Sequence, residues 1–299
     1  MNGVAEETLA QAHQAATVEA DGVNLRPMGE ADLEAAHALS VEVEWPHRLE
    51  DWRFVAALGE GFVAERDGQI VGTAIRWPWG EDHATLGMVI VAPQLQGRRV
   101  GQRLMQALMA GLEGRAVTLH ATVEGRGLYE RLGFVAQGEV RQHQGIAQPA
   151  PLVVPGPGLR LRPLGRGDAE HLIGLDRRAS GMPRGRALRI LLDTAEGVVL
   201  DNDGEAVGFS LLRRFGRGHA IGPVVAPDLA GAQALIAHWT GLLAQKFVRI
   251  DVEAHSGLIE WLEGQGLQRV GSVVVMSRGE PPQRGPSQGL YALINQALG

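Results

Sequence analysis

The chain of 299 residues carries the same series of short motifs twice, in the same order. The stretch LRPMGEADL begins at Leu25, and LRPLGRGDA begins at Leu161, 136 positions later. The turn DGQIVG at Asp67 returns as DGEAVG at Asp203, again 136 positions later, and the VAP at Val91 returns 134 positions later. Unrelated segments do not keep order and spacing in this way. The sequence therefore predicts two tandem copies of one fold.

A segment rich in proline and glycine separates the two copies. It spans residues 149–158, so we expect a first domain over residues 22–148 and a second over residues 159–299. Residues 1–21 have neither a basic start nor an apolar core. We therefore interpret them as a flexible leader and not as a signal peptide.

Helix and strand patterns alternate within each copy. The dipeptide DG at Asp67 predicts a β-hairpin. A long amphipathic helix is predicted over residues 96–114, with apolar residues recurring every four positions. The second copy repeats the order, and residues 289–298 are predicted to form a closing helix. These elements predict a mixed α/β fold in which helices cover a mixed sheet.

The composition limits the classes of function. The chain has no cysteine, which excludes disulfides, thiolate metal sites and a cysteine nucleophile. Its net charge of −6 argues against nucleic-acid binding through a broad basic surface. No apolar run approaches the ~18 residues that a membrane span needs. We expect a cytoplasmic protein with no metal, nucleic-acid or membrane partner, whose oligomeric state the sequence leaves open, a homodimer included.

The turn after the first VAP combines glycines and arginines at the start of a helix. Backbone N–H groups there point in one direction, and the positive end of the helix dipole favours an anion. Arg98 and Arg99 add positive charge that suits a phosphate. Neither G-x-G-x-x-G nor a Walker loop is present. The turn predicts an anion site, and the alternative is an ordinary helix start with solvated arginines.

Together with a later helix, this turn resembles the acyl-CoA loop of the GNAT family, the GCN5-related N-acetyltransferases. The family pattern Gln/Arg-x-x-Gly-x-Gly/Ala corresponds to QGRRVG at residues 96–101, and Leu-Tyr-x-x-x-Gly-Phe corresponds to LYERLGF at residues 128–134. Two positions depart from the family. Arg99 stands where glycine is usual, so its φ must stay negative or bear steric strain, and Thr122 stands where asparagine is frequent.

The resemblance implies an acetyl-CoA-dependent N-acetyltransferase followed by a degenerate GNAT-like domain. It implies that the pantetheine pairs with the strand before the turn and that the diphosphate lies on the turn. The residues so implied to bind the cofactor are Val89, Ile90, Val91, Gln96, Gly97, Arg98, Arg99, Val100, Gly101 and Gln102. Tyr129 is implied as the proton donor to the leaving thiolate, and the alternative is a ring that only packs in the core.

The acceptor side is less defined. Trp45, His47 and Arg48 lie where the variable acceptor segment of the family falls, and the alternative is an exposed connection with a structural tryptophan. The amine must also lose a proton to a base. The sequence offers several candidates without choosing among them: Glu44, His47, Glu65, Asp82, His83 and His120.

The second copy has lost both chemical features. Its turn carries Asp228 and no arginine, and Ile259 stands at the tyrosine position, so we expect it to pack against the first copy and shape the acceptor pocket. Asp176, Gly181 and Arg184 resemble the acceptor-side segment of a C-terminal domain in some tandem GNAT proteins, with a solvated loop as the alternative. The arginine–glycine stretch at residues 211–222 favours a basic hairpin over an RNA-binding segment.

The leading hypothesis is transfer of an acetyl group to an amine of a small metabolite or peptide. A non-catalytic acyl-CoA-binding sensor or regulatory module is the alternative, and an interaction module with an inactive site is a third interpretation. Loss of the Tyr129 hydroxyl separates an enzyme from a sensor, because only the enzyme loses rate. Failure to bind acetyl-CoA identifies the third.

Overall fold

The computed structural model describes residues 22–149 and 153–299, so the predicted leader and part of the predicted linker lie outside the described residues. The described chain divides into two compact units. Unit 1 comprises the residues up to Trp77 together with Leu86–Glu113, and unit 2 comprises Pro78–Thr85 together with Gly114–Gly299.

Unit 1 is a sheet with the strand order β1-β2-β3-β4, covered by helices. Its elements, some of whose end residues group with unit 2, are β1 (Asn24–Pro27), η1 (Glu30–Asp32), α2 (Leu33–Glu42), α3 (Leu49–Leu58), β2 (Glu60–Arg66), β3 (Gln69–Trp79), β4 (His83–Val91), η2 (Pro93–Leu95) and α4 (Val100–Met109). The predicted hairpin joins β2 to β3. Asp67 and Gly68 both take positive φ, at 50° and 76°, as a two-residue hairpin turn requires.

Helix α4 is shorter than the sequence predicted. Val100, Leu104 and Leu108 are buried, as the apolar spacing indicated. The helix ends at Met109, because Ala110 has extended backbone and Gly111 follows with φ 84°. Glycine at a positive φ is a common helix stop. The predicted continuation to residue 114 is therefore wrong, and so is the predicted start at residue 96, because α4 begins at Val100.

Unit 2 contains the last elements of the first repeat and all those of the second. They are β5 (Ala116–Ala121), α5 (Val123–Arg131), β6 (Val135–Ile146), β7 (Leu159–Pro163), α6 (Ala169–Ser180), α7 (Gly185–Thr194), β8 (Glu196–Asn202), β9 (Glu205–Phe215), β10 (Gly218–Ala226), α8 (Leu229–Leu242), β11 (Phe247–Glu253), α9 (Ile259–Gly264), β12 (Gln268–Arg278) and β13 (Gly289–Ala292). β10 pairs with β11 in parallel and with β9 antiparallel, so the sheet is mixed, as predicted.

The element order confirms the tandem repeat, since β7 to β12 follow the same succession as β1 to β6. An ion-pair network repeats with it. Arg26 donates through Nε to Glu65 at 2.8 Å and through Nη1 to Asp32 at 2.8 Å. Arg162, 136 positions after Arg26, donates through Nε to Asp201 at 2.9 Å. In each copy, the guanidinium at the corresponding position therefore joins the first strand to the second: β1 to β2 through Arg26, and β7 to β8 through Arg162.

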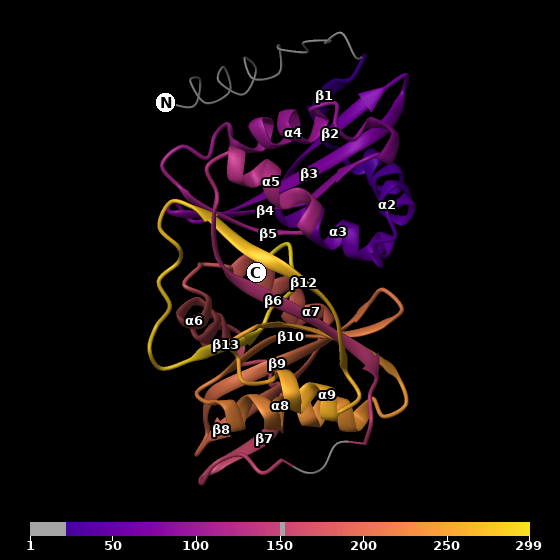
Figure 1. The fold of residues 1–299 in the computed structure, drawn as a ribbon. Coiled ribbons are helices and arrows are strands. Elements are labelled where there is room, and N and C mark those ends of the chain that lie inside the picture. The colour runs from indigo at the N-terminus through magenta and orange to yellow at the C-terminus, as the bar shows by residue number, and fades with distance from the viewer. Residues whose placement is uncertain (1–21, 150–152) are drawn as a thin grey trace. The chain divides into compact units, whose positions relative to one another are not determined.

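The two repeats exchange their last strands within unit 2. β12 of the second repeat pairs antiparallel with β5 of the first, and β6 of the first repeat pairs antiparallel with β11 of the second. β6 and β12 also pair with each other, and Figure 1 shows the magenta β6 running beside the yellow β12. The predicted domain limits at residues 148 and 159 therefore do not coincide with the compact units, and as functional limits they stay a prediction.

The predicted closing helix is wrong. Residues 289–292 form β13, which pairs antiparallel with β10 at Val224, Val225 and Ala226. β11 pairs with β10 only from His219 to Ile221, so the next backbone groups of β10 lack a neighbour on that side. β13 supplies it. Buried backbone groups need partners, and this need outweighs the helical spacing of the local sequence.

The main core of unit 2 lies between α8 and the sheet. Leu235, Ile236 and Trp239 of α8 pack with Val224 of β10 and Ile250 of β11, and all are buried. In residues 22–149 and 153–299, no helix has the length and apolar character that crossing a membrane demands.

Candidate functional site

The start of α4 in unit 1 lacks a side-chain cap. Its N-cap residue is Arg99, and no side chain accepts a hydrogen bond from the first turn. The first N–H groups of any helix have no partner within the helix. Gly97 is exposed with φ 75°, and nothing lies within 4 Å of where a Cβ would stand. Arg98 and Arg99 are exposed and form no ion pair among the described residues.

Arg99 adopts a backbone conformation that glycine favours, and glycine is the usual residue at this position of the family pattern. Its φ is 63° and its ψ is 6°, in the left-handed region. Of the two possibilities that the sequence left for Arg99, a negative φ or steric strain, the second holds, and the residue bears a steric cost on the order of 1 kcal/mol. The turn therefore keeps a backbone path that glycine usually provides, while adding a cation at the same position.

β4 leads into this turn and contains a local irregularity. Met88 has φ 53°, a rare value for a side chain of this size, and its carbonyl oxygen accepts a hydrogen bond from Thr73 Oγ1 at 2.8 Å. Val89 and Val91 are partly exposed, whereas Ile90 is buried. Gln96 Nε2 donates to the carbonyl oxygen of Val91 at 3.2 Å, so the turn is tied to the strand end. Of the ten predicted cofactor residues, three lie at the end of β4 (Val89–Val91), four in the turn (residues 96–99) and three in the first turn of α4 (residues 100–102).

The corresponding helix of the second repeat, α8, already has a side-chain cap at its start. Asp228 is the N-cap of α8, and its Oδ1 accepts a hydrogen bond from Gly231 N at 2.7 Å. A Cβ on Gly231 would stand 2.8 Å from Leu200 Cδ2, so little room exists beside the helix start. The carboxylate occupies the position that an anionic ligand would take. The sequence-level contrast between the two turns thus has a structural basis.

Tyr129 lies on α5 in unit 2, with 8% of its surface exposed. Its ring packs edge-on against Phe134, with 6.2 Å between the ring centres. No described residue hydrogen-bonds its hydroxyl. Burial raises the pKa of Tyr129 to about 12, so the hydroxyl is protonated at neutral pH. Thr122, the departure from asparagine, caps α5 through Oγ1, which accepts from Gly125 N at 3.3 Å.

The predicted acceptor residues of unit 1 cluster between α2 and α3. The rings of Trp45 and His47 have centres 5.5 Å apart. Arg48 donates to both carboxylate oxygens of Asp51, through Nε at 3.1 Å and Nη2 at 3.0 Å, and this bonding raises the pKa of Arg48. The guanidinium of Arg48 therefore anchors the start of α3, and the acceptor role of this cluster stays a prediction.

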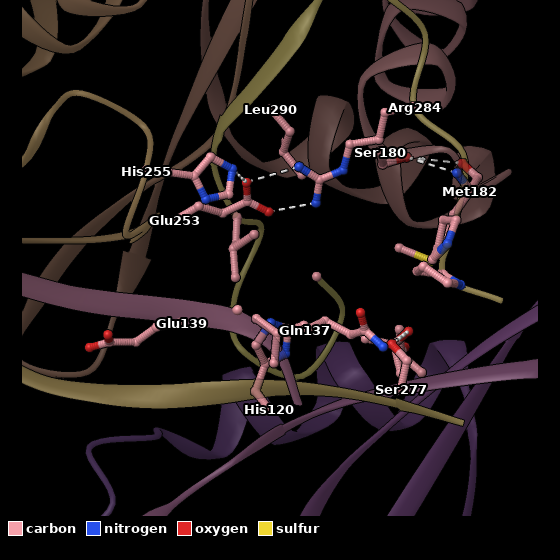
Figure 2. A pocket seen from close by; sticks show the side chains of 18 residues that line it. His120, Gln137, Glu139, Ser180, Met182, Glu253, His255, Ser277, Arg284 and Leu290 are labelled. Atoms are coloured by element: carbon pink, nitrogen blue, oxygen red, sulfur yellow. Dashed lines mark hydrogen bonds and ion pairs between the residues drawn. The ribbon is translucent and has the colours of Figure 1, made fainter. Parts of the chain in front are cut away.

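Unit 2 contains a cavity of about 280 Å³ that sequence reasoning did not identify. On one side, Glu253 accepts from Arg284 through Nη1 at 2.9 Å and Nη2 at 2.5 Å, and His255 Nε2 lies 3.2 Å from Glu253 Oε2. Figure 2 shows this group facing His120 and Gln137 across the cavity. The sequence held one signal: Asp251 and Glu253 alternate along β11, which places two acidic side chains on one face.

The predicted base candidates are distributed over both units. His120 lines the cavity, and burial lowers its pKa to about 4, so its imidazole is neutral at physiological pH. Glu65 is paired with Arg26. Glu44 and His47 belong to unit 1, and the two remaining candidates, Asp82 and His83, group with unit 2.

Asp176, Gly181 and Arg184 do not line this cavity, but Gly181 lies between its lining residues Ser180 and Met182, and Arg184 donates to the carbonyl oxygen of Gly299, another lining residue. Arg184 and Asp176 form a buried ion pair, with 2.7 Å between Nη2 and Oδ1. Gly181 has φ 73°, and a Cβ there would stand 2.7 Å from the carbonyl oxygen of Gln283. The alternative of a solvated loop is wrong for these residues, because Asp176 and Arg184 expose no more than 1% of their side chains.

Known proteins resemble this chain in both halves. Models described as Acetyltransferase (GNAT) domain match residues 57–136 and residues 172–292. The Uncharacterized N-acetyltransferase YitH of Bacillus subtilis (strain 168) is 31% identical over 224 residues, which cover 72% of this chain and 76% of that protein.

Solved structures share the fold at low identity. A putative acetyltransferase from Pyrococcus horikoshii has a TM-score of 0.78 at 20% identity, covering 96% of this chain and 99% of that one. A tandem GNAT protein from the clavulanic acid biosynthesis pathway has a TM-score of 0.62 at 14% identity, covering 86% and 98%. The tandem arrangement therefore occurs in a solved structure of the same fold.

Proposed function

The chain belongs to the GNAT family of acetyltransferases, and on that premise we propose that it transfers an acetyl group from acetyl-CoA to an amine of a small metabolite or peptide. In this proposal the first repeat, residues 22–148, is catalytic, and the second, residues 159–299, supports it. One observation carries the proposal: α4 begins without a cap beside Arg98 and Arg99, whereas α8 is capped by Asp228.

The start of α4 fits a diphosphate. The first-turn N–H groups of Val100, Gly101 and Gln102 are the donors that a helix leaves for an external acceptor. Gly97 leaves space for the anion, and Arg98 and Arg99 supply positive charge that no described carboxylate neutralises. Arginine holds phosphate oxygens through paired N–H donors, which suits this position.

When bound, acetyl-CoA supplies a thioester carbonyl that an amine nitrogen attacks. Val89, Ile90 and Val91 would hold its pantetheine by strand-like pairing, and a backbone N–H of this segment would stabilise the negative charge that develops on the carbonyl oxygen. The strain at Met88 is consistent with a functional role for this part of β4, since strained backbone concentrates at such sites.

Tyr129 holds a proton at its hydroxyl throughout the neutral pH range. Thiols ionise near pH 8.5. A full transfer from a phenol with a pKa of about 12 to a thiolate is therefore unfavourable on its own. Tyr129 accordingly stabilises the leaving thiolate as a hydrogen-bond donor, and the proton that completes the thiol comes from the attacking amine.

Before it attacks, the amine, which is an ammonium ion at neutral pH, must release a first proton to a base, and this proton is distinct from the one that later completes the thiol. His120 is the candidate that both lines a cavity and is neutral at physiological pH, so it can accept a proton. The other candidates remain open, and the acceptor side of unit 1 at Trp45, His47 and Arg48 remains a prediction.

Calorimetric titration with acetyl-CoA and an assay of free-thiol release with a panel of amines test the proposal. We expect Arg98→Glu with Arg99→Glu to weaken acetyl-CoA binding at least tenfold, on the order of 1.4 kcal/mol or more. Arg53→Glu is the matched control, because it reverses an exposed charge on α3 of the same unit. Equal affinities for the two proteins would contradict the proposed diphosphate site.

A further inference from the structure

We infer that the unit 2 cavity is the acceptor site, and that it takes a small organic cation, a primary amine without a carboxylate group. This inference rests on the proposed function. Thr85 of its lining lies on β4, the strand that continues into the predicted cofactor residues Val89–Val91, and His120 lies on β5, which leads into α5 and Tyr129.

The size of the cavity favours a single small molecule. Its volume of about 280 Å³ lies just below the ~300–1,000 Å³ typical of small-molecule sites. Met182, Pro281, Pro282, Leu290 and Leu293 give it an apolar wall. The body of an amine of a few carbon atoms fits such a wall, whereas a folded protein surface does not enter it.

The charges in the cavity select the class of ligand. Glu253 exposes 11% of its side chain, and a carboxylate has about four acceptor positions, so the bonds from Arg284 and His255 leave capacity for an ammonium group. Arg284 is already committed to Glu253 in a two-fold pairing. It therefore does not offer a free guanidinium to a substrate carboxylate, so an amino acid lacks a counter-ion here.

The opposite side of the cavity does not repel a cation. His120 faces Glu253 in Figure 2 and is neutral at physiological pH because of its burial. Gln137 contributes an uncharged amide to the same side. After transfer the ammonium group becomes a neutral amide and loses its attraction to Glu253. The same carboxylate thus favours binding of the substrate and release of the product.

The wall formed by residues 279–288 is fixed in place. Gly285 N donates to the carbonyl oxygen of Arg178 at 2.7 Å, and Arg178 Nε donates to Gln288 Oε1 at 3.1 Å. Gln283 approaches α6 so closely at Gly181 that no Cβ would fit there. A wall held in this way lowers the ordering cost of binding a small ligand.

Matched pairs of probes test the inference on the full chain. They are 2-phenylethylamine against phenylalanine and 1,5-diaminopentane against lysine, with a lysine-containing pentapeptide as a fifth probe. Binding is measured by saturation-transfer NMR in the low millimolar range without acetyl-CoA, and turnover by thiol release. We expect at least one carboxylate-free amine to bind and to exceed its carboxylated partner at least tenfold. Saturable binding by none of the probes, preference for the carboxylated partners, or turnover of the pentapeptide alone would overturn the inference.

Substitutions in the cavity lining test whether the amines bind in the cavity. Val275→Phe adds bulk to the lining, and Val270→Phe, on an exposed part of the same strand, is its control. Glu253→Gln removes the carboxylate, and Glu260→Gln, exposed on α9, is its control. We expect Val275→Phe and Glu253→Gln to weaken amine binding at least tenfold and to leave acetyl-CoA affinity within about twofold of the controls.

The outcomes separate this inference from the proposed function. If acetyl-CoA does not bind, the proposed function fails, and the amine titrations still test the cavity. If amines are acetylated and Val275→Phe binds them as well as Val270→Phe does, the function stands and the cavity assignment is wrong.

Discussion

The guanidinium of Arg184 donates to both carboxylate oxygens of Asp176, through Nε at 3.2 Å and through Nη2 at 2.7 Å, with both side chains buried. Its third nitrogen, Nη1, donates to the backbone oxygens of Leu298 and Gly299. Met182, two residues before Arg184, and Gly299 both line the cavity of unit 2. The pair therefore holds together lining residues of that cavity from two distant parts of the sequence.

Replacing Arg184 by methionine should destabilise unit 2 strongly. The change leaves the Asp176 carboxylate buried without its partner, which typically costs about 3–5 kcal/mol. The midpoint of urea unfolding measures the effect. The double variant Arg184→Met with Asp176→Leu should recover part of the loss, because no charge is then left uncompensated. A double variant less stable than Arg184→Met would contradict this explanation.

Tyr129→Phe should lower kcat without weakening acetyl-CoA binding. The hydroxyl is the only group removed, and loss of one hydrogen-bond donor to a developing negative charge commonly costs on the order of 100-fold or more in rate. Steady-state kinetics and calorimetry measure the two quantities separately. Tyr291→Phe, which changes the other tyrosine of the chain, is the control. A Tyr129→Phe protein with the original kcat would contradict the role proposed for the hydroxyl, whereas a protein that binds acetyl-CoA but releases no thiol with any amine would support the sensor interpretation.

Asp228→Ala should reduce stability and leave cofactor affinity unchanged. The carboxylate caps α8 through Gly231 N, and loss of such a cap costs about 0.5–2 kcal/mol. Thermal unfolding reports the loss, and calorimetry with acetyl-CoA reports the affinity. The prediction fails if the affinity changes as much as it does with Arg98→Glu and Arg99→Glu, because the two helix starts would then be equivalent.

Stability should fall in acid because of His120. Its folded-state pKa of about 4 lies below the value near 6.5 of an unfolded chain, so the unfolded state binds more protons between these pH values. The contribution is complete above about pH 6.5 and is lost as the pH falls toward 4, by up to about 3 kcal/mol. In urea unfolding, His120→Asn should flatten the dependence between pH 6.5 and 4.5 and leave the slope above pH 7 unchanged. An unchanged acid slope would contradict the lowered pKa of His120.

Local sequence patterns predicted the parts of this fold that local interactions determine. The hairpin at Asp67 and Gly68 follows from residues that tolerate positive φ, and the buried stripe of α4 follows from its apolar spacing. The contrast between Arg99 and Asp228 at the two helix starts was also visible in the sequence, because a cap or its absence depends on a few adjacent residues.

Features that depend on distant partners could not be predicted. β13 forms because β10 lacks a neighbour at Val224, which no local pattern reveals. The pairing of Glu253 with Arg284 joins residues 31 positions apart, and neither residue type indicates its partner. Asp176 and Arg184 were singled out for their residue types, but their burial as an ion pair follows only from the packing of α6 and α7.

The exchanged strands determine the order in which the sheet can form while the chain is being synthesised. Thr118 of β5 contacts Ser277 of β12, 159 positions later, so β5 lacks this neighbour until the residues between them have been translated. At ~5–20 residues per second, this interval lasts roughly 10 to 30 seconds. During that time an unpaired strand edge of the first repeat is open to other nascent chains. Faster elongation of this stretch, which shortens the exposure, or a chaperone that covers the edge would favour correct assembly.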